Sequence, residues 1–110
     1  MKQCEIWYAD LNPVKGSEQK GHRPVVIISG NAVNMHLPIV IACPLTTKIK
    51  KYKGNLLLEP DKQNGLTQTS EVMTFHIRSI SKERLIKKTG QITTEELNQI
   101  KQGLGDILRY

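Results

Sequence analysis

The 110-residue sequence contains only two cysteines, Cys4 and Cys43, and it has no long apolar run. A membrane-spanning helix needs about 20 predominantly apolar residues in a row, and no stretch approaches that length. Lys2 and Glu5 lie within the first six residues, so the start lacks the apolar centre of a signal peptide. These absences predict a cytoplasmic protein without a membrane span, whose reducing surroundings favour two free thiols over a disulfide.

Metal ligands at useful spacing are lacking as well. His22, His36 and His76 are scattered, with no cysteine or histidine at the separation that a zinc site requires. We therefore expect neither a metal nor another cofactor. Internal repeats and linker-like segments are also absent, and the length suits one domain. The sequence predicts a single domain over residues 1–110.

The sequence does contain a clear excess of positive charge. Sixteen Lys and Arg residues stand against ten Asp and Glu residues, which gives a formal net charge of +6. A folded surface with this charge attracts polyanions, so RNA, DNA, an acidic protein and an anionic membrane surface are the candidate partners. A domain this small leaves much apolar surface exposed, which favours a dimer.

The apolar pattern predicts short strands followed by one helix. Segments rich in β-branched residues, or alternating in polarity, predict strands at residues 5–11, 25–28, 39–43, 54–59 and 71–77. Residues 93–96 form a helix-capping pattern, and apolar residues then recur at helical spacing up to Leu108. This order predicts a mainly β (α+β) fold, a small antiparallel barrel or sandwich with a C-terminal helix packed on it.

Two glycines interrupt the expected C-terminal helix. Gly103 and Gly105 each cost a helix up to about 1 kcal/mol relative to alanine. Their presence indicates either fraying of the helix or close packing of its backbone, and the sequence leaves both open.

A glycine-bounded polar segment lies directly before the strand at 25–28, a position where sites are often built. Its candidate binding residues are Ser17, Glu18, Gln19, Lys20, His22 and Arg23. Pro24 follows Arg23 and fixes the backbone, so the guanidinium has little orientational freedom to lose when it meets a phosphate. A surface salt bridge explains Arg23 equally well from spacing alone.

A second group of polar residues follows the strand at 39–43. The hydroxyls of Thr46 and Thr47 can donate to an anionic oxygen, although threonines at a strand end are usually structural. The next segment places four cations around Tyr52, a composition suited to following a phosphate backbone while a base stacks; the cations are Lys48, Lys50, Lys51 and Lys53. A solvated run of charge is the commoner outcome for such a segment.

His76 and Arg78 form a third candidate pair. Two residues that are two apart on a strand share a face, so these side chains are expected to act together. His76 can move a proton or bond a base, whereas a satisfied, half-buried histidine is the more common case.

Three segments of the chain resemble the MazF/PemK family of toxin endoribonucleases, the toxin halves of bacterial type II toxin-antitoxin pairs. They are EIWYADLNPVKGSEQKGHRPVVIIS at 5–29, VIACPLTTKI at 40–49 and HIRSISKERLIKKTGQIT at 76–93. The resemblance implies an SH3-like barrel, a homodimer and metal-independent, sequence-selective cleavage of single-stranded RNA, chiefly messenger RNA. It also implies an acidic, partly disordered antitoxin, and promoter DNA binding only as the toxin-antitoxin complex.

The resemblance further implies a mechanism and residue roles. In the family, the ribose 2′-hydroxyl attacks the adjacent phosphorus and leaves a 2′,3′-cyclic phosphate and a 5′-hydroxyl. Arg23 matches the catalytic arginine, with phosphate stabilisation as its main role and proton donation to the leaving group as a second one. Thr46 matches a threonine that donates to a nonbridging oxygen. Glu18 lies in the GSEQ motif and is a candidate base, or a group that orients Arg23. His22 remains a candidate base as well.

The chain also departs from relatives of the family. Met73 and Phe75 stand where plasmid PemK-like toxins carry an arginine and an aspartate, and His76 stands where many MazF-like proteins have glutamine. Loops 48–53 and 61–70 are expected to help set the cleavage motif. The alternative functions are a CcdB-like toxin that binds DNA gyrase without cutting RNA, and an RNA-binding module without catalysis. The GSEQ and Arg-Pro features argue against the first of these.

Overall fold

The computed structural model describes residues 1–11 and 21–109 of the chain. Short strands, two helices and two 3-10 turns make up this part. In chain order they are β1 (Glu5–Asp10), β2 (His22–Ile27), α1 (Asn31–His36), β3 (Ile39–Thr46), β4 (Leu57–Leu58), β5 (Ser70–Val72), η1 (Thr74–His76), β6 (Arg78–Ser81), η2 (Lys82–Arg84), β7 (Leu85–Gln91) and α2 (Thr94–Arg109).

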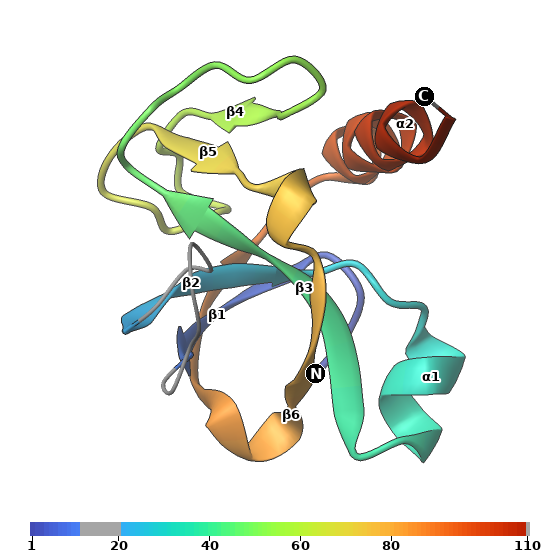
Figure 1. Ribbon diagram of the computed structural model, residues 1–110. Helices are drawn as coiled ribbons and strands as arrows, with labels where there is room; N and C mark the ends of the chain where they lie inside the picture. Colours follow the sequence, from blue (N-terminus) through green and yellow to red (C-terminus); the bar gives the residue numbers. More distant parts are fainter. Residues whose placement is uncertain (12–20, 110) are drawn as a thin grey trace.

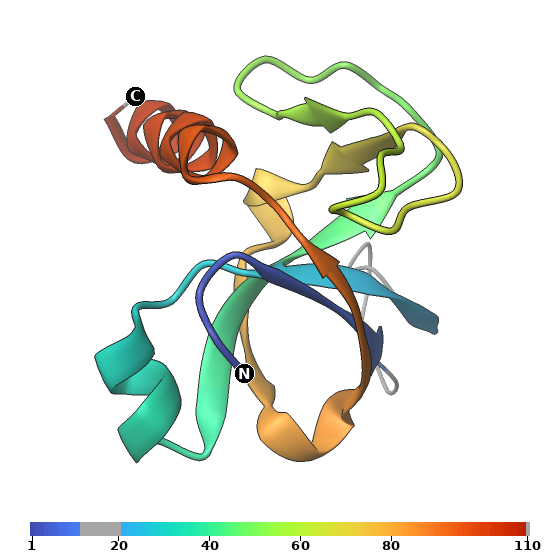
Figure 2. The ribbon, with the colours of Figure 1, turned by 180° about the vertical axis from the view of Figure 1, so that it is seen from behind.

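The strands pair antiparallel in the order β4-β5-β3-β2-β1-β7, and β6 joins beside β3. The long strand β3 is shared: its first half pairs with β6, and its last two residues pair with β5. The sheet therefore bends around β3 and curls into a half-barrel. Figures 1 and 2 show the β4–β5 hairpin and α2 on one side, while β6, η2 and β7 curl around the other. The predicted antiparallel fold with a C-terminal helix is confirmed.

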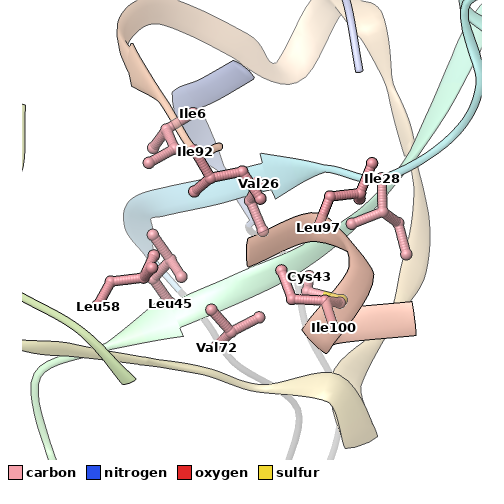
Figure 3. Packing of buried hydrophobic residues seen from close by; sticks show 10 residues of the cluster. All are labelled: Ile6, Val26, Ile28, Cys43, Leu45, Leu58, Val72, Ile92, Leu97 and Ile100. Carbon is pink, nitrogen blue, oxygen red and sulfur yellow. The ribbon is translucent and has the colours of Figure 1, made fainter. Parts of the chain in front are cut away.

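Strand β2 is buried on both faces, which explains its continuous apolar run. Val25 and Ile27 point into a core enclosed by the curl of β1, β3, β6 and β7. Val26 and Ile28 point to the opposite side, because successive side chains on a strand alternate. That second core lies between the sheet, the β4–β5 hairpin and α2; Figure 3 shows it, formed by Ile6, Val26, Ile28, Cys43, Leu45, Leu58, Val72, Ile92, Leu97 and Ile100.

Helix α2 begins at the capping pattern that the sequence predicted. The backbone N–H of Thr93 donates to Oε1 of Glu96 over 2.8 Å, and the backbone N–H of Glu96 donates to Oγ1 of Thr93 over 3.1 Å. The two glycines have different surroundings. A Cβ on Gly103 would lie 2.1 Å from the carbonyl oxygen of Gly54, whereas a Cβ on Gly105 would meet nothing within 4 Å. Gly103 is thus a site of close backbone packing.

The prediction of one continuous strand over 71–77 is wrong. Strand β5 ends at Val72, and a 3-10 turn occupies Thr74–His76. The backbone N–H of Thr74 donates to Oδ1 of Asn55 over 3.2 Å, and the hydroxyl of Thr74 donates to the same oxygen. These bonds draw the chain out of the extended conformation, and β6 begins as a new strand at Arg78.

Two further differences concern the strands. The predicted strand at 54–59 is shorter than expected, since β4 contains only Leu57 and Leu58. Strand β7 was not predicted, because most of its residues are polar or exposed. It lies at the edge of the sheet beside β1, where only one side of the strand has to be buried.

Both cysteines in the described part of the chain are free thiols, as predicted. Cys43 is fully buried in the core, and burial raises the pKa of its thiol to about 12. Within residues 1–11 and 21–109, no helix combines the length and the apolar character that a membrane crossing requires.

Candidate functional site

An open groove with a volume of about 600 Å³ lies where β2 begins and β3 ends. Its lining residues come from β2, β3, the loop after β3 and the η1 turn: Arg23, Pro24, Leu45, Thr46, Thr47, Lys48, Lys50, Tyr52, Met73 and His76. Arginine and lysines supply positive charge, and none of these described lining residues is acidic. Such a groove is suited to an extended anion.

Arg23 is held in the groove by the sheet. It belongs to β2, where it pairs with Ala9 of β1, and its Nη1 donates to the carbonyl oxygen of Leu45 over 3.3 Å. This bond places the guanidinium beside the end of β3. Burial lowers the pKa of Arg23, but an arginine keeps its charge under such conditions. The site therefore contains a fixed cation with further donors on its planar fork.

Thr46 is the last residue of β3 and is largely buried. Its Oγ1 accepts a hydrogen bond from the backbone N–H of Lys48 over 3.1 Å, which turns the chain sharply after the strand. This bond uses a lone pair of the hydroxyl, so the O–H hydrogen can still be donated to a ligand. The turn also directs the following lysines along the groove.

The basic segment 48–53 divides its side chains between two sides. Lys48, Lys50 and Tyr52 line the groove, whereas Lys51 does not. Lys53 lines a separate cavity of about 450 Å³ with Phe75, Asp106 and Ile107. The rings of Tyr52 and Phe75 make a T-shaped contact, with centroids 5.8 Å apart and planes at 80°. The alternation means that the groove receives only part of the predicted basic cluster.

His76 and Arg78 do not share a face, contrary to the prediction. His76 lies in the η1 turn and lines the groove. Arg78 lies in β6 outside the lining residues, and its Nη1 is buried without a hydrogen-bond partner among the described residues. The change from a 3-10 turn to a strand between them separates the two side chains.

His22 is placed beside Asp10 and Tyr8, outside the lining of the groove. Its Nε2 lies 3.6 Å from Oδ1 of Asp10, and its ring lies 5.9 Å from that of Tyr8 in an edge contact. Successive residues of a strand point to opposite sides, which separates His22 from Arg23. The predicted residues Ser17, Glu18, Gln19 and Lys20 lie outside the described part of the chain.

The sequence pattern did not single out three residues that organise the groove from behind. Glu71, Asn55 and Thr74 form a hydrogen-bonded network between the basic segment and η1. The available signal was Glu71 itself, an acid directly before the apolar pair Val72 and Met73. An acid at such a position needs compensating partners once it is buried.

The described residues form no evident metal site. Across residues 1–11 and 21–109, no group of three or more His, Cys, Asp or Glu side chains is placed to hold a metal ion.

Comparisons with known proteins agree with this geometry. Residues 2–108 match the family described as PemK-like, MazF-like toxin of type II toxin-antitoxin system. The chain is 34% identical over 105 residues to endoribonuclease EndoA of Bacillus subtilis, covering 94% of this chain and 90% of that protein.

Solved structures are similar as well. MazF from Deinococcus radiodurans superposes with a TM-score of 0.86 at 25% identity, covering 100% of this chain and 97% of that one. A mycobacterial endoribonuclease in complex with its cognate antitoxin gives a TM-score of 0.76 at 26% identity, covering 98% and 92%. The chain belongs to the PemK-like, MazF-like family of type II toxin-antitoxin toxins and is a MazF-like endoribonuclease.

Proposed function

We propose that this toxin cleaves single-stranded RNA, chiefly messenger RNA, in a sequence-selective reaction that needs no metal ion and stops translation and growth. The observation that carries the proposal is one groove shared by the guanidinium of Arg23, the hydroxyl of Thr46 and two lysines. Fixed donors in such a groove stabilise charge that develops on a reacting phosphate. Unpaired bases can enter an open groove, whereas bases in a duplex stay stacked.

The proposed reaction is an attack by the ribose 2′-hydroxyl on the adjacent phosphorus. The bond from phosphorus to the 5′-oxygen of the next nucleotide breaks and that oxygen takes up a proton, for which Arg23 is the candidate donor, so the products are a 2′,3′-cyclic phosphate and a 5′-hydroxyl. Arg23 stabilises the charge on the phosphorane, and Thr46 donates to a nonbridging oxygen. Glu18 is proposed to accept the 2′-hydroxyl proton or to orient Arg23. His22 stays a prediction as the other acceptor, although it lies outside the groove lining.

Substrate binding is assigned to the rest of the groove. Lys48 and Lys50 are proposed to contact flanking phosphates, and Tyr52 to stack against a base, a contact typically worth about 1 to 3 kcal/mol. His76 is proposed to bond a base edge or carry a proton. Ser17, Gln19, Lys20, Thr47, Lys51, Lys53 and Arg78 stay predictions as RNA contacts, with the last three outside the groove lining.

The direct experiment is incubation of the purified protein with a long RNA in EDTA, followed by mapping of the cut ends. We expect discrete cuts in unpaired regions, at the same rate with and without EDTA. The downstream fragments should accept a phosphate from polynucleotide kinase without prior phosphatase treatment, because they begin with a 5′-hydroxyl. Cuts that disappear in EDTA would contradict the metal-free reaction. Intact RNA together with inhibited gyrase would favour the CcdB-like alternative.

A cognate antitoxin is proposed as the protein partner. A similar mycobacterial endoribonuclease has been solved in complex with its own antitoxin, and the net charge of +6 suits an acidic, partly disordered partner. Promoter DNA is proposed to bind only through the toxin-antitoxin complex. The cytoplasm, where messenger RNA is translated, is the proposed location.

We also propose a homodimer, on the evidence of exposed apolar side chains near the end of α2. Phe75 is 53% exposed and Leu108 is 84% exposed, and Phe75 shares a cavity with Ile107. Apolar side chains gathered in this way commonly mark a protein interface.

The dimer makes a prediction for Phe75→Glu. Wild-type protein should have twice the 12.4 kDa mass of the chain in light scattering, and Phe75→Glu should move it to the monomer mass, because a charge without a partner opposes burial in an interface. Ile86→Glu is the matched control, since Ile86 is 55% exposed on the edge strand β7. A monomeric wild type would contradict the dimer, and equal behaviour of both variants would contradict the assigned surface.

A further inference from the structure

A buried carboxylate lies directly behind the basic segment that lines the groove. Glu71 of β5 is inaccessible to solvent, and it pairs across the sheet with Thr46 of β3. Burying a charged group is costly unless partners replace the lost water. The hydrogen-bond partners of Glu71 therefore indicate which part of the structure its negative charge stabilises.

Most of these partners are backbone N–H groups of the basic segment. Oε1 of Glu71 accepts from the backbone N–H of Lys50 over 2.7 Å and from that of Lys51 over 3.0 Å. Oε2 accepts from the backbone N–H of Tyr52 over 3.0 Å. Lys51 has a φ of 56°, a left-handed conformation that is unfavourable for lysine. This conformation lets consecutive N–H groups converge on one anion, as in an anion-binding nest.

The same carboxylate is connected to the opposite wall of the groove. Nδ2 of Asn55 donates to Oε2 of Glu71 over 2.8 Å, while Oδ1 of Asn55 accepts from the backbone and hydroxyl of Thr74. Thr74 begins the η1 turn that carries His76. Through Asn55, Glu71 thus connects the wall formed by Lys50 and Tyr52 with the wall formed by His76.

Glu71 remains charged in this environment. Burial by itself would raise the pKa of the carboxyl, but the hydrogen bonds from Asn55 and from the backbone of Lys50, Lys51 and Tyr52 outweigh it and leave the pKa below its usual value. The anion is therefore present at neutral pH to hold the basic segment.

We propose that Glu71 is a positioning residue for RNA cleavage, which acts by fixing the backbone of residues 50–52 so that Lys50 and Tyr52 face the groove beside Thr46. It contacts no substrate itself. This inference rests on the RNA cleavage proposed above.

The test is Glu71→Gln, which keeps the shape of the side chain and removes its charge. The amide of glutamine has one oxygen and one NH2 group, and the NH2 group cannot accept hydrogen bonds. Some of the N–H groups that now donate to the carboxylate therefore lose their acceptor, and the segment loses its fixed conformation. Loss of a negative charge alone strengthens attraction to RNA, whereas loss of positioning weakens it. The two explanations therefore predict changes of opposite sign. Glu59→Gln is the matched control, because Glu59 is exposed and its carboxylate accepts a surface hydrogen bond from the hydroxyl of Thr69.

Binding is measured with a short RNA taken from a mapped cleavage site, carrying deoxyribose at the attacking sugar so that it is not cut. We expect Kd for Glu71→Gln to rise about tenfold, which corresponds to about 1.4 kcal/mol. The slope of log K against log salt should fall by about one, as when a single lysine–phosphate contact is lost. With cleavable RNA, KM should rise by a similar factor and kcat should change little. Glu59→Gln should show neither loss.

A double-mutant cycle with Lys50→Ala tests whether Glu71 acts through that lysine. Lys50→Ala should reduce the salt slope by about one, and adding Glu71→Gln should reduce it no further, because coupled residues are not additive. If thermal melting shows that Glu71→Gln does not fold, Asn55→Ala takes its place; it removes one bond to the carboxylate and should shift KM in the same direction by less.

The outcomes separate this inference from the proposed function. Failure of wild-type protein to cut RNA contradicts the proposed function. If the wild type cuts RNA and the folded Glu71→Gln variant has an unchanged KM and salt slope, only the role of Glu71 is overturned. Fully additive losses in the cycle would overturn its action through Lys50.

Discussion

Replacing Arg23 by alanine should lower kcat for RNA cleavage several hundredfold while the protein stays folded. Removal of one preorganised donor from a reacting oxyanion typically costs about 3 to 4 kcal/mol of transition-state stabilisation. Arg23 combines such donors with a positive charge on one planar group, which a lysine does not. Its bond to the carbonyl of Leu45 is one of the contacts that the substitution removes, and a hydrogen bond of this kind contributes about 1 kcal/mol to stability.

Matched variants separate the electrostatic role of Arg23 from a general effect of charge. Arg23→Lys keeps the charge but loses the planar fork, so it should retain more activity than Arg23→Ala and less than wild type. Thr46→Val removes one donor with little change in shape and should cost less than Arg23→Ala. Lys87→Ala, on the exposed edge strand β7, should change the rate about twofold or less. Initial rates on one mapped cleavage site measure all four, and a loss below about tenfold in Arg23→Ala would contradict the assigned role.

Local features of the chain were predictable from the sequence. The Thr93 and Glu96 capping pattern, the doubly buried strand β2 and the placement of Arg23 and Thr46 at strand ends depend on neighbouring residues and on strand periodicity. These features need only short-range geometry, which the order of residues specifies directly. They sufficed to predict the antiparallel fold and to single out Arg23 and Thr46, which both line the groove.

Features that depend on distant contacts were not predictable in this way. The segment 71–77 alternates like a strand, but the bonds from Thr74 to Asn55, which lies on another loop, convert half of it to a turn. The same contact separates His76 from Arg78. Glu71 gains its importance from the backbone of a loop about twenty positions earlier. Tertiary hydrogen bonds overrode the local pattern at each of these places.

Gly103→Ala should destabilise the protein by about 2 kcal/mol or more, although helix propensity alone predicts a gain of up to about 1 kcal/mol. The added Cβ would lie 2.1 Å from the carbonyl oxygen of Gly54 and 3.2 Å from its carbonyl carbon. Both are backbone atoms, so the loop or the helix has to move. Gly54 itself has a φ of +92°, a conformation that residues with a side chain rarely adopt.

Gly105→Ala is the control, because its Cβ would meet nothing within 4 Å and it should gain up to about 1 kcal/mol. The Tm values of the two variants should therefore shift in opposite directions from that of the wild type, and the Tm of Gly103→Ala should be lower by about 8 °C or more. Equal stabilisation of both variants would show that the helix and loop separate freely.

Gly54 precedes Asn55, which bonds to Glu71, so the displaced loop should also disturb the carboxylate that holds Lys50. A rise in KM for RNA in folded Gly103→Ala, without a comparable rise in Gly105→Ala, would connect the packing of α2 to the conformation of the groove.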